Sequence, residues 1–312
     1  MSIHIRFGGT QLARLLLPLC LCLVSLGHPQ ADESSTASPQ MRQASVNGVT
    51  LAYQEQGQGA PVVFVHGNPG DHRTWEGERA AIARDHRFIA VDLRYFGSAP
   101  WPDDGAKFSV ATHADDLAAL IRALKAGPVV LVGWSYGAAV ALVTAAQHPE
   151  LISGLFLYEP ALTTFVSDPA DAKAAADDRQ DMLAPVIAAT KAGKVVDAVR
   201  SVPDRVTGVP GTFDTLPPPV QASLLENARV LPVAFAAPPP PKVTCTQLGE
   251  IKIPVTIARG ELTRTFYRIA ADTASQCIPG SRLLVVPGAR HVWPAQQPSA
   301  FDDALREFLA KG

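Results

Sequence analysis

Short apolar runs alternate with longer amphipathic stretches along most of this 312-residue chain. The runs are four to six residues long and rich in Val, Ile and Leu, which is typical of strands buried on both faces. In several of the stretches between these runs, apolar residues recur at the spacing of an amphipathic helix. This alternation predicts an α/β fold with a doubly wound, mainly parallel sheet. The predicted strands are residues 62–65, 88–93, 129–132, 155–158, 254–258 and 282–286, and the predicted helices lie within 75–84, 112–125 and 138–148.

The alternation begins with a hairpin and is interrupted once. Residues 44–56 resemble two strands joined at Asn47-Gly48, a dipeptide that favours a tight turn. Residues 161–249 are instead rich in Ala and Asp, with helical stretches at 170–189 and 220–228. An insertion of this length between two strands predicts a helical cap over the strand ends, and leaves 44–160 and 250–312 as the α/β core.

The N-terminus has the layout of a secretory signal peptide. Arg6 and Arg14 precede an apolar run, residues 15–26, which is too short to span a bilayer. Ser25-Leu26-Gly27 offers a small-residue cleavage site, and a cut after Ala31 is the alternative. We therefore expect residues 1–27 to be removed, and the protein to be exported to the periplasm or secreted without stable membrane anchoring.

The segment after the signal peptide, residues 28–43, is rich in Ser, Pro and Gln and is expected to be a disordered leader. Removal of residues 1–27 takes away two Arg of the 27 basic residues and none of the 29 acidic ones, so the net charge changes from −2 to −4. Without an excess of basic residues, the charge does not indicate binding to nucleic acid or to an anionic membrane surface.

Cysteine usage points to a disulfide. Of the four cysteines, only Cys245 and Cys277 lie outside the expected signal peptide. Two cysteines in an exported chain favour a bridge, with two buried free thiols as the alternative. Neither belongs to a C-x-x-C motif or a Cys/His cluster, so the sequence predicts no metal site and no cofactor.

The most specific chemical signal is Gly133-Trp134-Ser135-Tyr136-Gly137, which follows one predicted strand and opens an Ala-rich helix. A sharp strand-to-helix turn of this kind holds its central residue in a strained conformation, and the two glycines let the backbones pass closely. Ser135 would then stand at a helix N-terminus, whose amides favour a developing negative charge. We interpret Ser135 as a nucleophile.

With these residues the chain resembles α/β-hydrolase-fold enzymes over about residues 45–160 and 250–308. In that family the catalytic residues appear in the order Ser, acid, His, and His291 stands in the turn after the last strand, where the family's general base stands. His66-Gly67-Asn68-Pro69 resembles the family's oxyanion-hole segment. The resemblance implies that the backbone N–H groups of Asn68 and Tyr136 bind the substrate oxyanion.

The acid of the triad is open to two assignments. The family's common position is a Gly-x-x-Asp turn after the next-to-last strand, and here that turn reads Gly260-Glu261-Leu262-Thr263. Glu159, which closes the strand at 155–158, occupies a position that some family members use. We favour Glu159 and keep Glu261 as the alternative acid.

The resemblance implies a serine hydrolase that cleaves a small-molecule carboxylic ester or lactone through an acyl-serine intermediate. Haloalkane dehalogenases and epoxide hydrolases share the His-Gly-Asn-Pro segment but use an Asp nucleophile, and Ser135 here favours acyl transfer instead. A perhydrolase or acyltransferase using the same triad is an alternative. So is a non-catalytic ligand-binding homologue, although such proteins usually lack a triad member.

Overall fold

The computed structural model describes residues 1, 3–4, 8–9 and 38–311. By internal contacts the chain divides into Met1–Glu33 and Ser34–Gly312, and every strand and helix that the structure describes lies in the second unit. The expected signal peptide, residues 1–27, and most of the expected leader, residues 28–43, lie outside the described residues.

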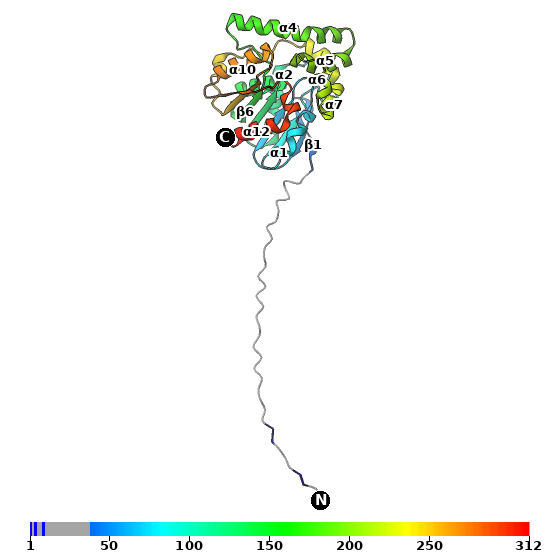
Figure 1. Ribbon diagram of the computed structural model, residues 1–312, viewed down its shortest axis with the longest axis vertical. Helices are drawn as coiled ribbons and strands as arrows, with labels where there is room; N and C mark the ends of the chain where they lie inside the picture. The colour runs from blue at the N-terminus through cyan, green and yellow to red at the C-terminus, as the bar shows by residue number, and fades with distance from the viewer. Residues whose placement is uncertain (2, 5–7, 10–37, 312) are drawn as a thin grey trace. The chain divides into compact units, whose positions relative to one another are not determined.

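The described part of the chain forms one eight-stranded sheet in the order β1-β2-β4-β3-β5-β6-β7-β8 (Figure 1). The pairs from β4 onward are parallel, whereas β1 and β2 run antiparallel to their neighbours. The strands are β1 (Gln40–Val46), β2 (Val49–Gln56), β3 (Pro61–Val65), β4 (Arg87–Val91), β5 (Val129–Trp134), β6 (Ile152–Tyr158), β7 (Val255–Gly260) and β8 (Arg282–Val286).

Helices cover both faces of this sheet. Alternate residues of a strand point to opposite faces, and in β3 Val63 and Val65 pack with helices α2 and α3, whereas Val62 and Phe64 pack with α1 and α12. The predicted doubly wound α/β fold is therefore confirmed. The helical elements outside the stretch between β6 and β7 are η2 (His72–Trp75), α1 (Glu76–Ile82), α2 (Val110–Leu124), α3 (Tyr136–Gln147), η3 (Pro149–Leu151), α10 (Thr265–Cys277), α11 (Trp293–Gln296) and α12 (Pro298–Leu309).

The chain between β6 and β7 is helical, at the top of Figure 1. The stretches expected at 170–189 and 220–228 are helical, and a further helix occupies 195–207. The division into a core and a cap at residues 161–249 stays a prediction. The elements are α4 (Pro169–Lys191), α5 (Val195–Thr207), α6 (Thr212–Thr215), α7 (Pro218–Glu226), η4 (Asn227–Val230), α8 (Leu231–Ala236) and α9 (Cys245–Leu248).

The first strand begins earlier than the sequence pattern indicates. The pattern assigns residues 40–43 to the end of the leader, but they form the start of β1 and pair with β2 from Gln40↔Glu55 onward. β1 is an edge strand, and its first four residues are exposed. Polar residues are compatible with an exposed edge strand, so composition alone does not distinguish them from a leader.

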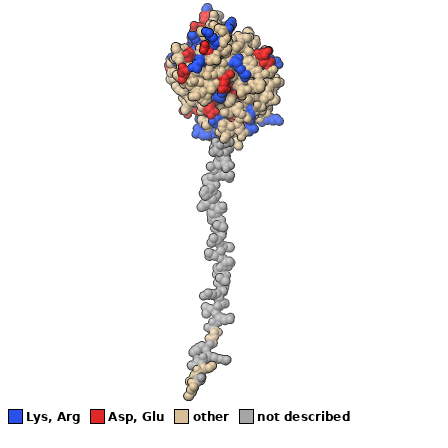
Figure 2. Space-filling model, turned by 90° about the vertical axis from the view of Figure 1, so that its right-hand side faces the viewer, with Lys and Arg blue, Asp and Glu red and all other residues tan. Residues whose placement is uncertain are grey.

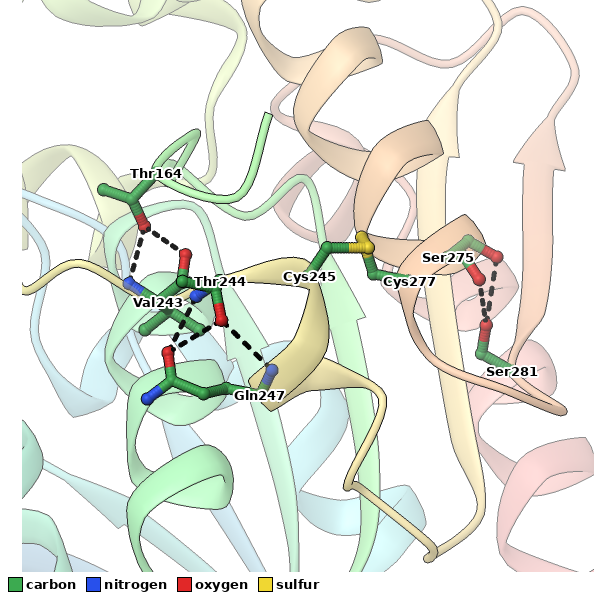
Figure 3. The surroundings of a disulfide bond; sticks show 8 residues. All are labelled: Thr164, Val243, Thr244, Cys245, Gln247, Ser275, Cys277 and Ser281. Carbon is green, nitrogen blue, oxygen red and sulfur yellow. Dashed lines mark hydrogen bonds between the residues drawn. A yellow bond between two sulfur atoms is a disulfide. The ribbon is translucent and has the colours of Figure 1, made fainter. Parts of the chain in front are cut away.

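A disulfide joins Cys245, the first residue of α9, to Cys277, the last residue of α10 (Figure 3). The two sulfurs are 2.02 Å apart and the Cα atoms 5.0 Å apart. A capping box at Thr244 and Gln247 fixes the start of α9 beside the bridge. The pair therefore ties the segment before β7 to the helix after it.

We expect thiol titration of the denatured, unreduced protein comprising residues 28–312 to find no free thiol. The bridge closes a loop with a sequence separation of 32 residues, which by the chain-entropy model stabilises the fold by roughly 3–4 kcal/mol. Reduction should lower the urea midpoint accordingly, while the Cys245→Ser, Cys277→Ser double variant should be insensitive to reductant. Two free thiols in the unreduced protein would refute the bridge.

Two buried carboxyl groups face the contact between α1 and α12. Glu78 and Asp302 are buried, and three of their four carboxyl oxygens have no hydrogen-bond partner among the described residues. Burial raises the pKa of Asp302 to about 7, with Asp303 adding to the shift and Arg306 and Arg84 opposing it. Burial, with Asp302 nearby, also raises the pKa of Glu78 well above its usual range.

These shifts make the protein less stable as the pH rises. An unfolded Asp releases its proton near pH 4, whereas folded Asp302 keeps it until about pH 7. The contribution of protonated Asp302 to the free energy of unfolding is therefore fully present below pH 4 and is lost between pH 4 and about 7. We expect Asp302→Asn to raise the free energy of unfolding at pH 8 by roughly 1–3 kcal/mol and to change it little near pH 4. Urea denaturation at both pH values measures this. A variant that is more stable than wild type only at low pH would contradict the prediction.

The face shown in Figure 2 carries acidic and basic side chains interspersed among uncharged ones, without a large area of one sign. Within the described ranges, no helix has both the length and the apolar character needed to cross a bilayer.

Candidate functional site

Ser135 lies at a sharp turn between β5 and α3. Its φ of 56° and ψ of −116° are a left-handed conformation that costs a non-glycine residue energy and that persists only where the surroundings impose it. The flanking glycines permit the close backbone contacts of this turn. A Cβ at Gly133 would lie 2.6 Å from Ala138 Cα, and one at Gly137 would lie 2.1 Å from Val65 O. The expected strand–turn–helix around Ser135 is thus present, with both glycines required by close backbone contacts.

Three side chains that are distant in sequence form a continuous hydrogen-bonded row at this turn. His291 Nε2 lies 2.9 Å from Ser135 Oγ, and His291 Nδ1 lies 2.5 Å from Glu159 Oε2. Glu159 and His291 are buried, while Ser135 is partly exposed. A carboxylate at Nδ1 keeps the proton on that nitrogen and leaves Nε2 free to accept the Ser135 proton.

Glu159, directly after β6, is fixed by its backbone and by a second hydrogen bond. Its φ is 49°, again in the left-handed region, and its amide donates to Ala258 O. Gly260 N–H donates to its other oxygen, Oε1, at 2.8 Å. A Cβ at Gly260 would lie 2.3 Å from Ala289 O, so only glycine allows this close approach. Both carboxylate oxygens of Glu159 therefore have defined donors.

The alternative acid, Glu261, has a different partner. It is exposed, and its Oε2 accepts a hydrogen bond from Gly288 N–H at 2.8 Å. It supports the turn after β8 instead of contacting the imidazole. The structure therefore brings Glu159 to His291 and leaves Glu261 outside the row.

Two aromatic residues next to the row hold the loop that carries His291. Trp134 Nε1 donates to His291 O at 2.8 Å, and Tyr158 OH donates to Arg290 O at 2.7 Å. Each directly precedes a member of the row, Ser135 or Glu159. Sequence reasoning did not assign these anchoring contacts, because the two carbonyls they reach lie more than 130 positions away in the chain.

The loop after β3 passes directly beside the nucleophile. A Cβ at Gly67 would lie 3.4 Å from Ser135 Cβ. His66 Nδ1–H donates to Gly67 O at 2.9 Å, and His66 Nε2 accepts from Leu93 N–H at 3.2 Å. Burial lowers the pKa of His66, which favours this neutral form. His66 therefore shapes the loop that presents Asn68, and does not contact Ser135 as a base.

Tyr136, the second expected oxyanion donor, is the first residue of α3. Its amide precedes the helical hydrogen-bond ladder and is one of the free N–H groups at a helix N-terminus. Its hydroxyl lies 2.7 Å from His113 Nδ1. Burial lowers the pKa of His113 to about 3, so this imidazole is neutral and holds the Tyr136 side chain through a neutral hydrogen bond.

A polar network joins the loop after β3 to the helical insertion. Asp71 accepts hydrogen bonds from Arg73 and, through Oδ2, from Asn227 Nδ2 at 2.8 Å. Asn227 Oδ1 accepts from Gly97 N–H in the loop after β4. Burial raises the pKa of Asp71 but the Arg73 guanidinium outweighs it, and the pKa falls to about 2. The insertion is thereby fastened next to the site.

This network also contains the group of side chains closest to a metal-binding arrangement in the described part of the chain. Asp71, His72 and Asp92 each offer one atom, and these atoms lie within 4.8 Å of one another. Asp71 already pairs with Arg73, and His72 donates to Asp92 Oδ1 from both its amide and its Nδ1, at 2.8 and 2.7 Å. The atoms of these three side chains that could bind a metal therefore already have hydrogen-bond or ion-pair partners within the protein.

Comparisons with known proteins identify the family to which the fold belongs. A family model for the α/β-hydrolase fold matches residues 60–294. A 2-(acetamidomethylene)succinate hydrolase of Mesorhizobium japonicum is 27% identical over 274 residues, which cover 86% of this chain and 94% of the relative.

Solved structures of lower sequence identity share the fold of this chain. Carboxylesterase CesB of Bacillus subtilis superposes with a TM-score of 0.69 at 19% identity, covering 90% of this chain and 94% of that one. The N-acyl homoserine lactone degrading enzyme Est816 superposes with a TM-score of 0.68 at 23% identity, covering 86% and 100%. At these identities the likeness shows a shared fold, while the family match spans most of the chain. The chain therefore belongs to the α/β-hydrolase fold family, as a hydrolase with esterase-like neighbours.

Proposed function

We propose that this protein is an exported serine hydrolase that cleaves a carboxylic ester or a lactone through an acyl-Ser135 intermediate. The observation that carries the proposal is the unbroken row of hydrogen bonds from Glu159 through His291 to Ser135. A nucleophile within hydrogen-bond reach of a base, which is in turn oriented by a third group, is the arrangement that activates a serine hydroxyl.

In the proposed reaction, Ser135 Oγ attacks the substrate carbonyl carbon while His291 Nε2 takes its proton. Collapse of the tetrahedral intermediate breaks the bond to the leaving alkoxide, to which His291 returns the proton. A water molecule then attacks the acyl group with His291 again as base, and Ser135 is regenerated. Glu159 accepts the Nδ1–H throughout and stabilises the imidazolium that forms in each half of the reaction.

The negative charge on the carbonyl oxygen needs hydrogen-bond donors. We assign this role to the N–H groups of Asn68 and Tyr136, supported by the passage of the Gly67 loop beside Ser135 and by the position of Tyr136 at the start of α3. Preorganised donors of this kind are worth about 2.7–4 kcal/mol each in the barrier.

A panel of p-nitrophenyl esters of increasing acyl length, together with simple lactones, tests the proposal and locates the substrate class. We expect turnover of at least one series, and loss of that turnover after treatment with a fluorophosphonate. A wild-type protein that neither hydrolyses any ester or lactone nor reacts with the fluorophosphonate would overturn the proposal and favour a ligand-binding role.

Export is a separate part of the proposal, supported by the sequence of residues 1–27. When the full chain is expressed in a bacterial host, we expect the protein recovered outside the cytoplasm to begin at His28 or, after the alternative cut, at Asp32. N-terminal sequencing and intact mass measure this. Recovery of the whole protein from the cytoplasm, with residues 1–27 still attached, would contradict it.

A further inference from the structure

Tyr267 stacks on the base of the proposed triad, yet the proposed reaction does not use it. Its ring lies flat against the His291 imidazole, with the ring centroids 3.8 Å apart and the planes inclined by 17°. The Ser135 side chain lies near its hydroxyl. The residue is buried, so its contacts are made within the protein and not with solvent.

The helix that carries Tyr267 is fastened to the insertion. Tyr267 lies in the first turn of α10, where Phe266 N–H donates to Asp178 Oδ2 of α4 at 2.9 Å. Asp178 also accepts from the Arg264 guanidinium, at 2.7 Å in its shortest contact. Arg264 in turn reaches Asp181 of the same helix at 2.7 Å. The place of Tyr267 over the imidazole is therefore set by α4 as well as by the core.

We infer that Tyr267 is a positioning residue for the reaction: its ring fixes the plane of the His291 imidazole, and α4 sets its place through Asp178. This inference rests on the proposed serine mechanism and adds to it a contact by which the insertion acts on the catalytic groups.

One physical effect arises from this contact. A ring face parallel to an imidazole attracts the protonated ring, and His291 carries that proton when the tetrahedral intermediate forms. This effect does not involve the substrate directly, so it acts on kcat and leaves KM nearly unchanged.

Other charged groups near Tyr267 are fixed by different elements. Glu159 lies after β6, Arg179 on α4, and Arg264 immediately before α10. Burial raises the pKa of the Tyr267 hydroxyl, with Glu159 adding to the shift, so the hydroxyl stays protonated and able to donate throughout the pH range of an esterase assay. Changes in the pH profile of Tyr267 variants therefore come from the imidazole and not from titration of the tyrosine.

Two substitutions test the role of the ring. Tyr267→Phe keeps the ring and should lose less of kcat than Tyr267→Met, with the acidic limb of the kcat/KM pH profile in place. Tyr267→Met keeps an apolar side chain without a ring face. It should lower kcat by roughly 10-fold and move the acidic limb about 0.5 pH unit lower, because the protonated imidazole loses its stacking partner.

Phe266→Leu is the matched control, because Phe266 is an equally buried ring on the same helix that does not stack on His291. It should lower thermal stability while leaving the acidic limb in place and kcat within about threefold of wild type. A purely structural role for Tyr267 would give the same pattern in Tyr267→Met as in this control.

The inference is overturned if folded Tyr267→Met keeps the wild-type acidic limb and kcat. Should that variant not fold, Tyr267→Leu, which also lacks a ring face, decides the matter, and a wild-type acidic limb and kcat in that variant would overturn the inference. An inactive wild-type protein would instead refute the proposed serine mechanism, so the two failures are distinguishable.

Discussion

Replacement of Ser135 by alanine is expected to lower kcat for ester hydrolysis by at least about 10⁴-fold, because the nucleophile of the proposed acyl-enzyme is removed. His291→Ala should cost nearly as much, since without the imidazole the Ser135 hydroxyl has no base within reach. Steady-state kinetics of purified variants measure both losses, with near-ultraviolet circular dichroism as the check that the fold is unchanged.

The double variant distinguishes a working triad from two independent contributions. Triad members act as a unit, so Ser135→Ala, His291→Ala should be little slower than either single variant. Losses that multiply would mean that the two side chains do not cooperate. Substantial turnover by purified Ser135→Ala would contradict the assignment of the nucleophile.

The second large effect is expected from Glu159→Gln, at about 10³–10⁴-fold in kcat. Gly260 N–H donates to Oε1 of residue 159, so the single oxygen of a glutamine amide faces that donor and its NH₂ group faces His291. The imidazole would then accept at Nδ1 and carry its proton on Nε2. In that tautomer it cannot take the proton of Ser135.

Glu261→Gln provides the matched control, because it makes the same chemical change in the loop where the alternative acid was expected. Its partner is Gly288 N–H and not the imidazole. Its kcat should therefore fall by less than about tenfold. The reverse ranking of the two variants in kcat would transfer the role of acid to Glu261.

The sequence predicted the parts of this molecule that depend on local pattern. Apolar runs of strand length located the parallel strands, and the glycines around Ser135 predicted a turn whose close backbone contacts leave no room for a Cβ at Gly133 or Gly137. The order of Ser135 and His291 along the chain placed both at one edge of the sheet. These features depend on periodicity and backbone sterics, which act over a few residues.

Features that depend on tertiary contacts could not be predicted in this way. Glu159 and Glu261 both follow strands that end at the same sheet edge, and only the contacts of their carboxylates with Gly260 and Gly288 separate them. Helix α5 was not predicted from the sequence; it contains Pro203, which is unfavourable inside a helix, and it packs against α4. Tyr267 gave no signal, since nothing near it in the sequence indicates that it stacks on His291.

Fluorophosphonate labelling followed by peptide mass spectrometry tests the central claim most directly, because it asks which atom acts as the nucleophile. The account predicts one covalent adduct per molecule, on the peptide that contains Ser135, with no labelling of Ser135→Ala and strongly slowed labelling of His291→Ala. A wild-type protein that hydrolyses esters while the adduct lies on another residue, or while no adduct forms, would contradict it.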